Sequence, residues 1–334
     1  MPGIATNSLP QRSIESLSGL VVAPGLSLDG AGGASAQPPI SSRFAMITRV
    51  SQIVISHPVA KVYSGKMMKR FRLIAVALCA LTPLPAIAQS QADVLSAELL
   101  SGWQMENGHH MAGLSLQLAP SWKTYWRAPG EAGIPPLFNW SGSENVKSIR
   151  IHWPSPQVFH TNGMQTIGYH DAVVLPLEVT PRDASKPVLL RAQVDLGVCK
   201  DICMPATVVV EALLENPGQG DAAILAALKS RPKSASEGGV TDLICAVEPI
   251  ADGLRVTATL TMPFSGVAET VAFESRDPMV WVGQAESVRQ GQSLVSVVDM
   301  VSSSGAPFAL DRSGVTVTVL QQGRAVEVIG CPAP

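Results

Sequence analysis

Five cysteines are the residues of this 334-residue chain best suited to chemistry, and two of them stand four positions apart. Cys199 and Cys203 enclose the tripeptide Lys200-Asp201-Ile202. In an extended strand the two would lie about 13 Å apart, too far for a disulfide, so the chain must turn between them if they pair. Strand-like sequence ends near Gly197 and resumes after Met204-Pro205, which predicts a hairpin with both thiols at its tip.

Three kinds of chemistry suit this cysteine pair. It can be a redox-active dithiol, a structural disulfide at a hairpin tip, or, together with Met204, a soft ligand set for Cu(I). A thioredoxin-type site is disfavoured because that chemistry uses two intervening residues and a helix N-terminus, whereas here three residues intervene and no helical pattern follows. The spacing by itself leaves the three interpretations open.

A secretory signal is predicted ahead of these cysteines. The basic segment Met67–Arg72 is followed by the apolar run Leu73–Leu81, which is too short to span a membrane, and then by Ala86-Ile87-Ala88. This pattern predicts cleavage after Ala88 and export to the periplasm. Residues 1–66, rich in Ser, Gly, Pro and Ala, are expected to be disordered or untranslated, with translation starting at Met67 or Met68.

Export leaves four cysteines, since Cys79 departs with the signal, and an oxidising compartment favours two disulfides among three combinatorial pairings. Closing the five-residue loop of Cys199 and Cys203 restricts the unfolded chain by only about 2 kcal/mol, whereas closing the loop from Cys245 to Cys331 contributes roughly 4.6 kcal/mol. Cys245 and Cys331 are therefore predicted to form a structural disulfide, and the short loop suits a bond that is easily reduced.

Composition excludes one functional class. The formal net charge is -2 and 15% of residues are charged, without a dense basic stretch, so no nucleic acid is expected as a partner.

The fold class predicted is all-β, with an immunoglobulin-like β-sandwich over residues 89–215 and a second β-rich, sandwich-like domain over 241–334. Short β-forming runs broken by Gly, Pro and Asn clusters support both. A linker over residues 216–240 contains a short helix that Asp221 caps and that extends to Leu228. The expected strands are 95–103, 112–118, 146–153, 172–179, 188–196, 207–214, 255–261, 270–275, 293–298, 315–320 and 325–329.

Several segments of the first domain together resemble the N-terminal periplasmic domain of the DsbD family of protein-disulfide reductases, in its ScsB-like, suppressor-of-copper-sensitivity branch. These segments are Ala112–Leu114, Trp122–Gly130, Gly133–Pro136, Phe138–Ser141, Ile167–Tyr169, Leu175–Leu177 and Gly197–Pro205.

The resemblance implies a thiol–disulfide oxidoreductase of the protein-disulfide reductase type that needs no cofactor. By analogy, a membrane electron donor of the DsbD/ScsB type reduces the domain, which then reduces periplasmic thioredoxin-fold proteins. Cys203 is expected to form the mixed disulfide and Cys199 to resolve it. The chain ends at Pro334 without the family's membrane or terminal thioredoxin-like domains, so either its electrons are expected to come from a separate protein or its task is expected to differ. The runner-up function is periplasmic copper binding and copper tolerance through Cys199, Cys203 and Met204.

The family's aromatic cap over the cysteines has no clear counterpart here. Phe159, His160 or Met164 is expected to shield the pair. Tyr125, Trp126 and Trp140 are predicted to be packing residues, following the usual burial of aromatic side chains.

Overall fold

The structure is a computed structural model that describes residues 90–334, apart from residues 162 and 306. The described residues form an all-β structure of mainly antiparallel sheets, with two short helices and one 3-10 turn. The predicted extension, signal peptide and cleavage site lie outside the described residues. Among the helices in the part that is described, none is long and apolar enough to cross a membrane.

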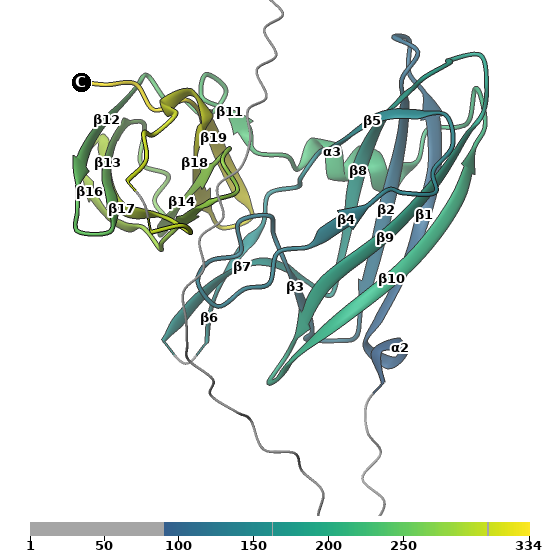
Figure 1. Ribbon diagram of the computed structural model, residues 1–334, viewed down its shortest axis with the longest axis horizontal. Coiled ribbons are helices and arrows are strands. Elements are labelled where there is room, and N and C mark those ends of the chain that lie inside the picture. Colours follow the sequence, from purple (N-terminus) through teal and green to yellow (C-terminus); the bar gives the residue numbers. More distant parts are fainter. Residues whose placement is uncertain (1–89, 162, 306) are drawn as a thin grey trace, which may run out of the picture. The chain divides into compact units, whose positions relative to one another are not determined.

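The first sandwich consists of two sheets, here called A and B (Figure 1). Sheet A has the strand order β1-β2-β8-β5, and sheet B has the order β10-β9-β3-β7-β6, with β4 also paired to β9. Their bounds are β1 Leu95–Gln104, β2 His110–Leu118, β3 Lys123–Tyr125, β4 Leu137–Asn139, β5 Val146–Ile151, β6 Gln157–Thr161, β7 Met164–His170, β8 Ala172–Pro181, β9 Val188–Cys199 and β10 Cys203–Leu214. The helix α2, Gln91–Val94, precedes β1.

The core of this sandwich follows from alternation along its strands. Every second residue of these strands faces the core. Examples that are almost completely buried and meet in one cluster are Leu114 and Leu175 on sheet A and Leu190 and Val194 on sheet B. Alternate residues of each strand point to the opposite face, so the same pattern that fills the core also decides which residues face outward.

The outward face of sheet A is covered in part by α3, Ala222–Lys229. Asp221 caps this helix by accepting hydrogen bonds from the amides of Ala223 and Ile224. Ile224 is fully buried against Gly113, where a Cβ would stand 2.8 Å from its Cγ1, so the absence of a side chain on Gly113 lets the helix approach the sheet.

A polar cluster lies on the same outward face. Glu178 of β8 accepts from Nδ1 of His109 at 2.7 Å and from Nε2 of His152 at 2.9 Å. These hydrogen bonds lower the pKa of Glu178, with the bond from His109 making the largest contribution.

The second sandwich also has two sheets, here called C and D. Sheet C has the order β11-β19-β18-β14, with β11 parallel to β19, and sheet D has the order β12-β13-β17-β15, with β16 also paired to β17. Their bounds are β11 Lys233–Ser234, β12 Asp242–Pro249, β13 Gly253–Thr261, β14 Glu269–Ser275, β15 Val280–Val282, β16 Glu286–Gln290, β17 Ser293–Ser302, β18 Val315–Gln321 and β19 Arg324–Ile329, with the 3-10 turn η1 at Arg312–Gly314. Its core joins residues of both sheets, among them Val256, Val298, Phe273 and Val317.

Several short strands of the structure were not expected from the sequence, including β3, β4, β6 and β7. Each has seven residues or fewer, and Gly or Pro interrupts the neighbouring sequence, so no alternating run is long enough to reveal it. Strands β3 and β4 pair with strands far away in the sequence, and β3 lies between β7 and β9, whereas β6 pairs with the adjacent β7.

Candidate active site: a disulfide at the end of a long hairpin

The pair Cys199 and Cys203 forms a disulfide at the tip of the β9–β10 hairpin. The two strands pair over their whole length, from Val188 opposite Leu214 to Cys199 opposite Cys203. The hairpin predicted from the spacing is confirmed, although the strands continue past Gly197 and up to the cysteines themselves. The turn therefore contains only the three residues between them, of which Lys200 donates its amide to the carbonyl of Ile202.

The two cysteines differ in exposure. Cys199 is fully buried, whereas Cys203 is exposed to solvent. Beside them, Ile202 at the tip has 66% of its surface exposed. Cys203 is therefore the more accessible cysteine of the pair.

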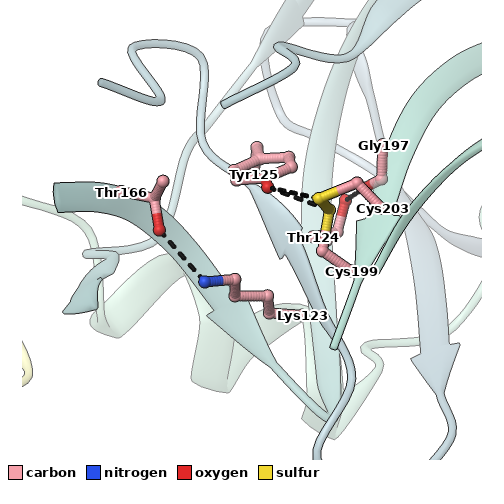
Figure 2. The surroundings of a disulfide bond; sticks show 7 residues. All are labelled: Lys123, Thr124, Tyr125, Thr166, Gly197, Cys199 and Cys203. Atoms are coloured by element: carbon pink, nitrogen blue, oxygen red, sulfur yellow. Dashed lines mark hydrogen bonds between the residues drawn. A yellow bond between two sulfur atoms is a disulfide. The ribbon is translucent and has the colours of Figure 1, made fainter. Parts of the chain in front are cut away.

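Tyr125 is the side chain that contacts both sulfurs (Figure 2). Its Oη lies 2.9 Å from Sγ of Cys199 and 3.4 Å from Sγ of Cys203. Because disulfide sulfurs carry no proton, the hydroxyl is the donor in this state. Burial raises the pKa of Tyr125, so the hydroxyl keeps its proton and stays a donor at physiological pH.

Long-range strand pairing brings Tyr125 to the cysteines. In β3, Thr124 lies opposite Val198 of β9, and its hydroxyl donates to the carbonyl of Gly197 at 3.0 Å. Tyr125 follows Thr124 and is 74 positions away from Cys199 along the chain, yet the sheet makes the two neighbours.

Two glycines make room for the Tyr125 ring. A Cβ at Gly197 would stand 3.0 Å from Cε2 of the ring and 2.9 Å from Cβ of Ile134. A Cβ at Gly133 would stand 2.9 Å from Cδ1 of the same ring. The ring is thus enclosed between β9 and the loop that follows β3, and this enclosure directs its hydroxyl to the disulfide.

The register of sheet B shows which residues share a face with the cysteines. Lys123 lies opposite both Cys199 of β9 and His170 of β7, and Phe159 of β6 lies opposite Thr166 of β7. All of them point away from the core. We call this side of sheet B the disulfide face; it consists of Cys199, Cys203, Lys123, Tyr125, Phe159, Thr166 and His170.

The three residues expected to shield the cysteines occupy different places. Phe159 lies half-buried on the disulfide face, with its ring edge-to-face against His170 at 4.7 Å and the ammonium of Lys123 5.1 Å from its centre. His160, the next residue of β6, is exposed on the opposite face by alternation. Met164 begins β7 with 53% of its surface exposed. A shielding role for any of them stays a prediction.

Sequence reasoning missed Tyr125 as a site residue, because it was assigned to packing with Trp126 and Trp140. Trp126 is fully buried in the core, and Trp140 stacks on Phe138 at 5.6 Å between ring centres. Alternation places Trp126 on the core side and Tyr125 on the other side. The available signal was therefore the alternation itself, but three residues of β3 were too few to show it.

The structure disfavours the copper ligand set that the sequence suggested. Met204 lies opposite Val198, and both point into the core of the first sandwich, away from the sulfurs. Within the residues that the structure describes, no group of three or more His, Cys, Asp or Glu side chains is arranged to hold a metal ion.

The other disulfide joins Cys245 to Cys331, 86 positions apart, and both cysteines are buried. The amide of Cys245 donates to the carbonyl of Pro332, and the guanidinium of Arg312 donates to the carbonyls of Cys245 and Cys331. This bond fastens the end of the chain to β12 and lies within the core of the second sandwich.

Comparison with known proteins agrees with this architecture. Among curated proteins, none matches the sequence. The crystal structure of the N-terminal periplasmic domain of ScsB from Proteus mirabilis aligns with a TM-score of 0.55 and 23% sequence identity, covering 74% of this chain and 96% of that one. At this identity the likeness establishes the fold.

Residues 91–215 match the family model described as thiol:disulfide interchange protein DsbD, N-terminal. That range covers β1 to β10 and therefore the whole first sandwich with its cysteine hairpin. The Cys199–Cys203 disulfide fits the thiol–disulfide interchange that the description names. Residues 91–215 therefore form a domain similar to the N-terminal domain of the thiol:disulfide interchange protein DsbD.

Proposed function

We propose that this protein is a periplasmic thiol–disulfide exchange protein that passes reducing equivalents to thioredoxin-fold partners through Cys199 and Cys203. The observation that carries the proposal is the asymmetry of the hairpin disulfide, in which Cys203 is an exposed residue and Cys199 is fully buried with its sulfur against the hydroxyl of Tyr125. A membrane protein of the DsbD/ScsB type is the proposed electron donor.

The exposed cysteine is suited to begin the exchange. In the reduced protein the thiolate of Cys203 attacks one sulfur of the partner's disulfide, and the partner's other sulfur leaves as a thiolate. The thiolate of Cys199 then attacks Sγ of Cys203 and breaks the bond to the partner. Two electrons pass to the partner, which becomes a dithiol, and the Cys199–Cys203 disulfide forms again.

Tyr125 supports both directions of this exchange. Its hydroxyl lies within hydrogen-bonding distance of both sulfurs, so it can donate to whichever sulfur carries negative charge. Hydrogen bonds to charged groups are stronger than those between neutral groups, so this contact is expected to strengthen as the disulfide opens.

The test is to trap the mixed disulfide. The purified protein, reduced at Cys199 and Cys203 with the Cys245–Cys331 disulfide intact, is mixed with oxidised thioredoxin, and the products are separated under non-reducing conditions and identified by mass. We expect Cys199→Ser to accumulate a Cys203–thioredoxin disulfide, because the thiol that would resolve it is gone.

The matched control is Cys203→Ser, which retains a cysteine four residues away. We expect it to form no such adduct, because Cys199 is buried. A double Cys245→Ser/Cys331→Ser variant should exchange like the parent. Equal trapping by both single variants, or none by either, would refute the assignment of roles.

A further inference from the structure

Lys123 is a buried cation that the exchange described above does not use. Its side chain is 8% exposed, and its Nζ donates to Oγ1 of Thr166 at 3.1 Å (Figure 2). Its other described contact is with the ring of Phe159, 5.1 Å from Nζ to the ring centre. Both partners are uncharged, although buried ammonium groups are usually paired with a carboxylate.

The position of Lys123 in the sheet gives it a charged partner in one redox state only. Lys123 lies directly opposite Cys199 in the β3–β9 pairing, and both side chains are on the disulfide face. Cβ atoms of directly opposed residues are about 5 Å apart, which the four-carbon side chain of a lysine can span. In the oxidised protein Cys199 is neutral, and the ammonium is directed to Thr166 of β7 instead.

Cys199 needs such a partner when the disulfide opens. It must be a thiolate to resolve the mixed disulfide, and it leaves as a thiolate when a donor attacks Cys203. A fully buried thiol in apolar surroundings resists ionisation, so compensation is required. Tyr125 offers a hydrogen bond to this sulfur but no charge.

We propose that Lys123 is a positioning residue that stabilises the thiolate of Cys199 in the reduced protein and so controls the resolving step of thiol exchange. Its ammonium leaves Thr166 and pairs with the sulfur when the disulfide is reduced, and returns when the disulfide forms. Lys123 keeps its proton throughout, while the proton of the Cys199 thiol passes to solvent. This role rests on the function proposed above, because it presupposes that Cys199 is the resolving cysteine.

The other residues that make up the disulfide face include no carboxylate and no second lysine or arginine. Tyr125 of β3 keeps its proton, β7 contributes His170, β10 contributes Cys203, and β6 contributes the uncharged Phe159. At the hairpin tip, Lys200 and Asp201 are exposed to solvent. Burial lowers the pKa of Lys123 in the oxidised protein, which agrees with a cation that lacks a charged partner in that state.

The experiment titrates the thiols of the isolated reduced protein, so it needs no exchange partner. The alkylation rate of each cysteine by iodoacetamide is followed over a pH series by peptide mass mapping, for the parent and for Lys123→Met. We expect the midpoint for Cys199 to rise by about one pH unit in the variant, equivalent to an alkylation rate about tenfold lower below the midpoint. Resolution of a preformed Cys203 mixed disulfide should slow to a similar extent near neutral pH.

Lys200→Met is the matched control, because it removes the same charge next to Cys199 in sequence but at an exposed position. We expect the titration midpoint of Cys199 to stay nearly the same in this variant, because solvent and salt screen a charge at an exposed position. A Lys123→Met protein that is folded, with the same midpoint as the parent, would overturn the proposal. So would an equal shift in both variants, which would indicate a general charge effect.

A measurement on the parent covers the case in which Lys123→Met does not fold. Electrostatic coupling is reciprocal, so the amine of Lys123 should titrate at a higher pH in the reduced protein than in the oxidised one. Identical titration of the amine in both redox states overturns the proposal. If the Lys123 amine titrates differently in the two redox states but no mixed disulfide with thioredoxin is trapped, only the proposed function is refuted.

Discussion

The two disulfides of this protein have the same chemistry but opposite surroundings. Cys199–Cys203 joins residues that the hairpin already holds opposite each other, and one of the two residues, Cys203, is exposed. Cys245–Cys331 joins residues 86 positions apart, and both sulfurs are buried in the second core. The first bond therefore adds little to the fold and is open to attack, whereas the second restrains the chain and is protected.

This difference shows that a disulfide's role is decided by what else holds its two ends. The β9–β10 ladder keeps Cys199 beside Cys203 whether or not the sulfurs are joined, so the bond can open without loss of the site. In the second sandwich, by contrast, Cys331 follows the last strand, and the disulfide is a main connection from this terminal segment to β12. The predictions below test this contrast, from the largest expected effect to the smallest.

Removing the buried disulfide should give the largest loss of stability. For the double variant Cys245→Ala/Cys331→Ala, loop-closure entropy predicts a loss of roughly 4.6 kcal/mol in the free energy of unfolding of the second sandwich. Urea denaturation followed by fluorescence and circular dichroism measures this loss. Thiol exchange through Cys199 and Cys203 should persist in the same variant, and its disappearance would show that the two regions are not independent.

The two disulfides should also differ in reduction potential. Loop closure alone differs by about 2.6 kcal/mol between them, equivalent to roughly 55 mV, and burial widens the gap. Equilibration with graded thiol buffers, followed by alkylation and mass counting, should show Cys199–Cys203 opening above about -300 mV while Cys245–Cys331 stays closed. Simultaneous reduction of both bonds would remove the contrast.

Tyr125→Phe should alter the redox site without affecting the scaffold. Loss of a hydroxyl that donates to a thiolate is expected to cost the reduced form about 1 kcal/mol, so the reduction potential of Cys199–Cys203 should fall by roughly 20 mV. The buried ring is retained, so the oxidised protein should unfold at nearly the same urea concentration. An unchanged potential would show that the contact in the oxidised state has no counterpart after reduction.

Gly197→Ala tests whether the position of the tyrosine ring matters. The added methyl group would crowd both Tyr125 and Ile134, so we expect the hydroxyl to move away from the sulfurs and the potential to fall by a similar or smaller amount than in Tyr125→Phe. In the double variant with Tyr125→Phe, the two effects on potential should not add, because both act through the same hydroxyl. Full additivity would mean that Gly197 acts in another way.

The smallest effect concerns acid stability of the scaffold. The pKa of Glu178 is lowered in the folded protein, so its contribution to stability is present above the ordinary glutamate pKa of 4.5 and is lost as pH falls through the folded value. We expect Glu178→Gln to remove this pH dependence, with an effect below about 1 kcal/mol. Urea midpoints measured over an acidic pH series test it, while the redox potential of the cysteine pair at neutral pH should be unchanged.

Much of this organisation can be predicted from local sequence. The spacing of Cys199 and Cys203 indicated a hairpin because strand geometry forbids a disulfide between residues four apart unless the chain turns. Alternating runs such as Val188–Leu196 located the long strands, and Asp221 located the start of α3. Each of these features depends on residues within one strand, one turn or one helical cap.

The composition of the redox site was decided only by tertiary structure. Tyr125 reaches the sulfurs, Lys123 lies opposite Cys199, and Met204 turns into the core because of the register between strands that are far apart in the sequence. A shift of that register by one residue would exchange the two faces of a strand and bring different side chains to the cysteines. Local sequence thus determined that a cysteine hairpin forms, whereas long-range pairing determined which residues surround it, because strand pairing is fixed by the packing of the whole sandwich.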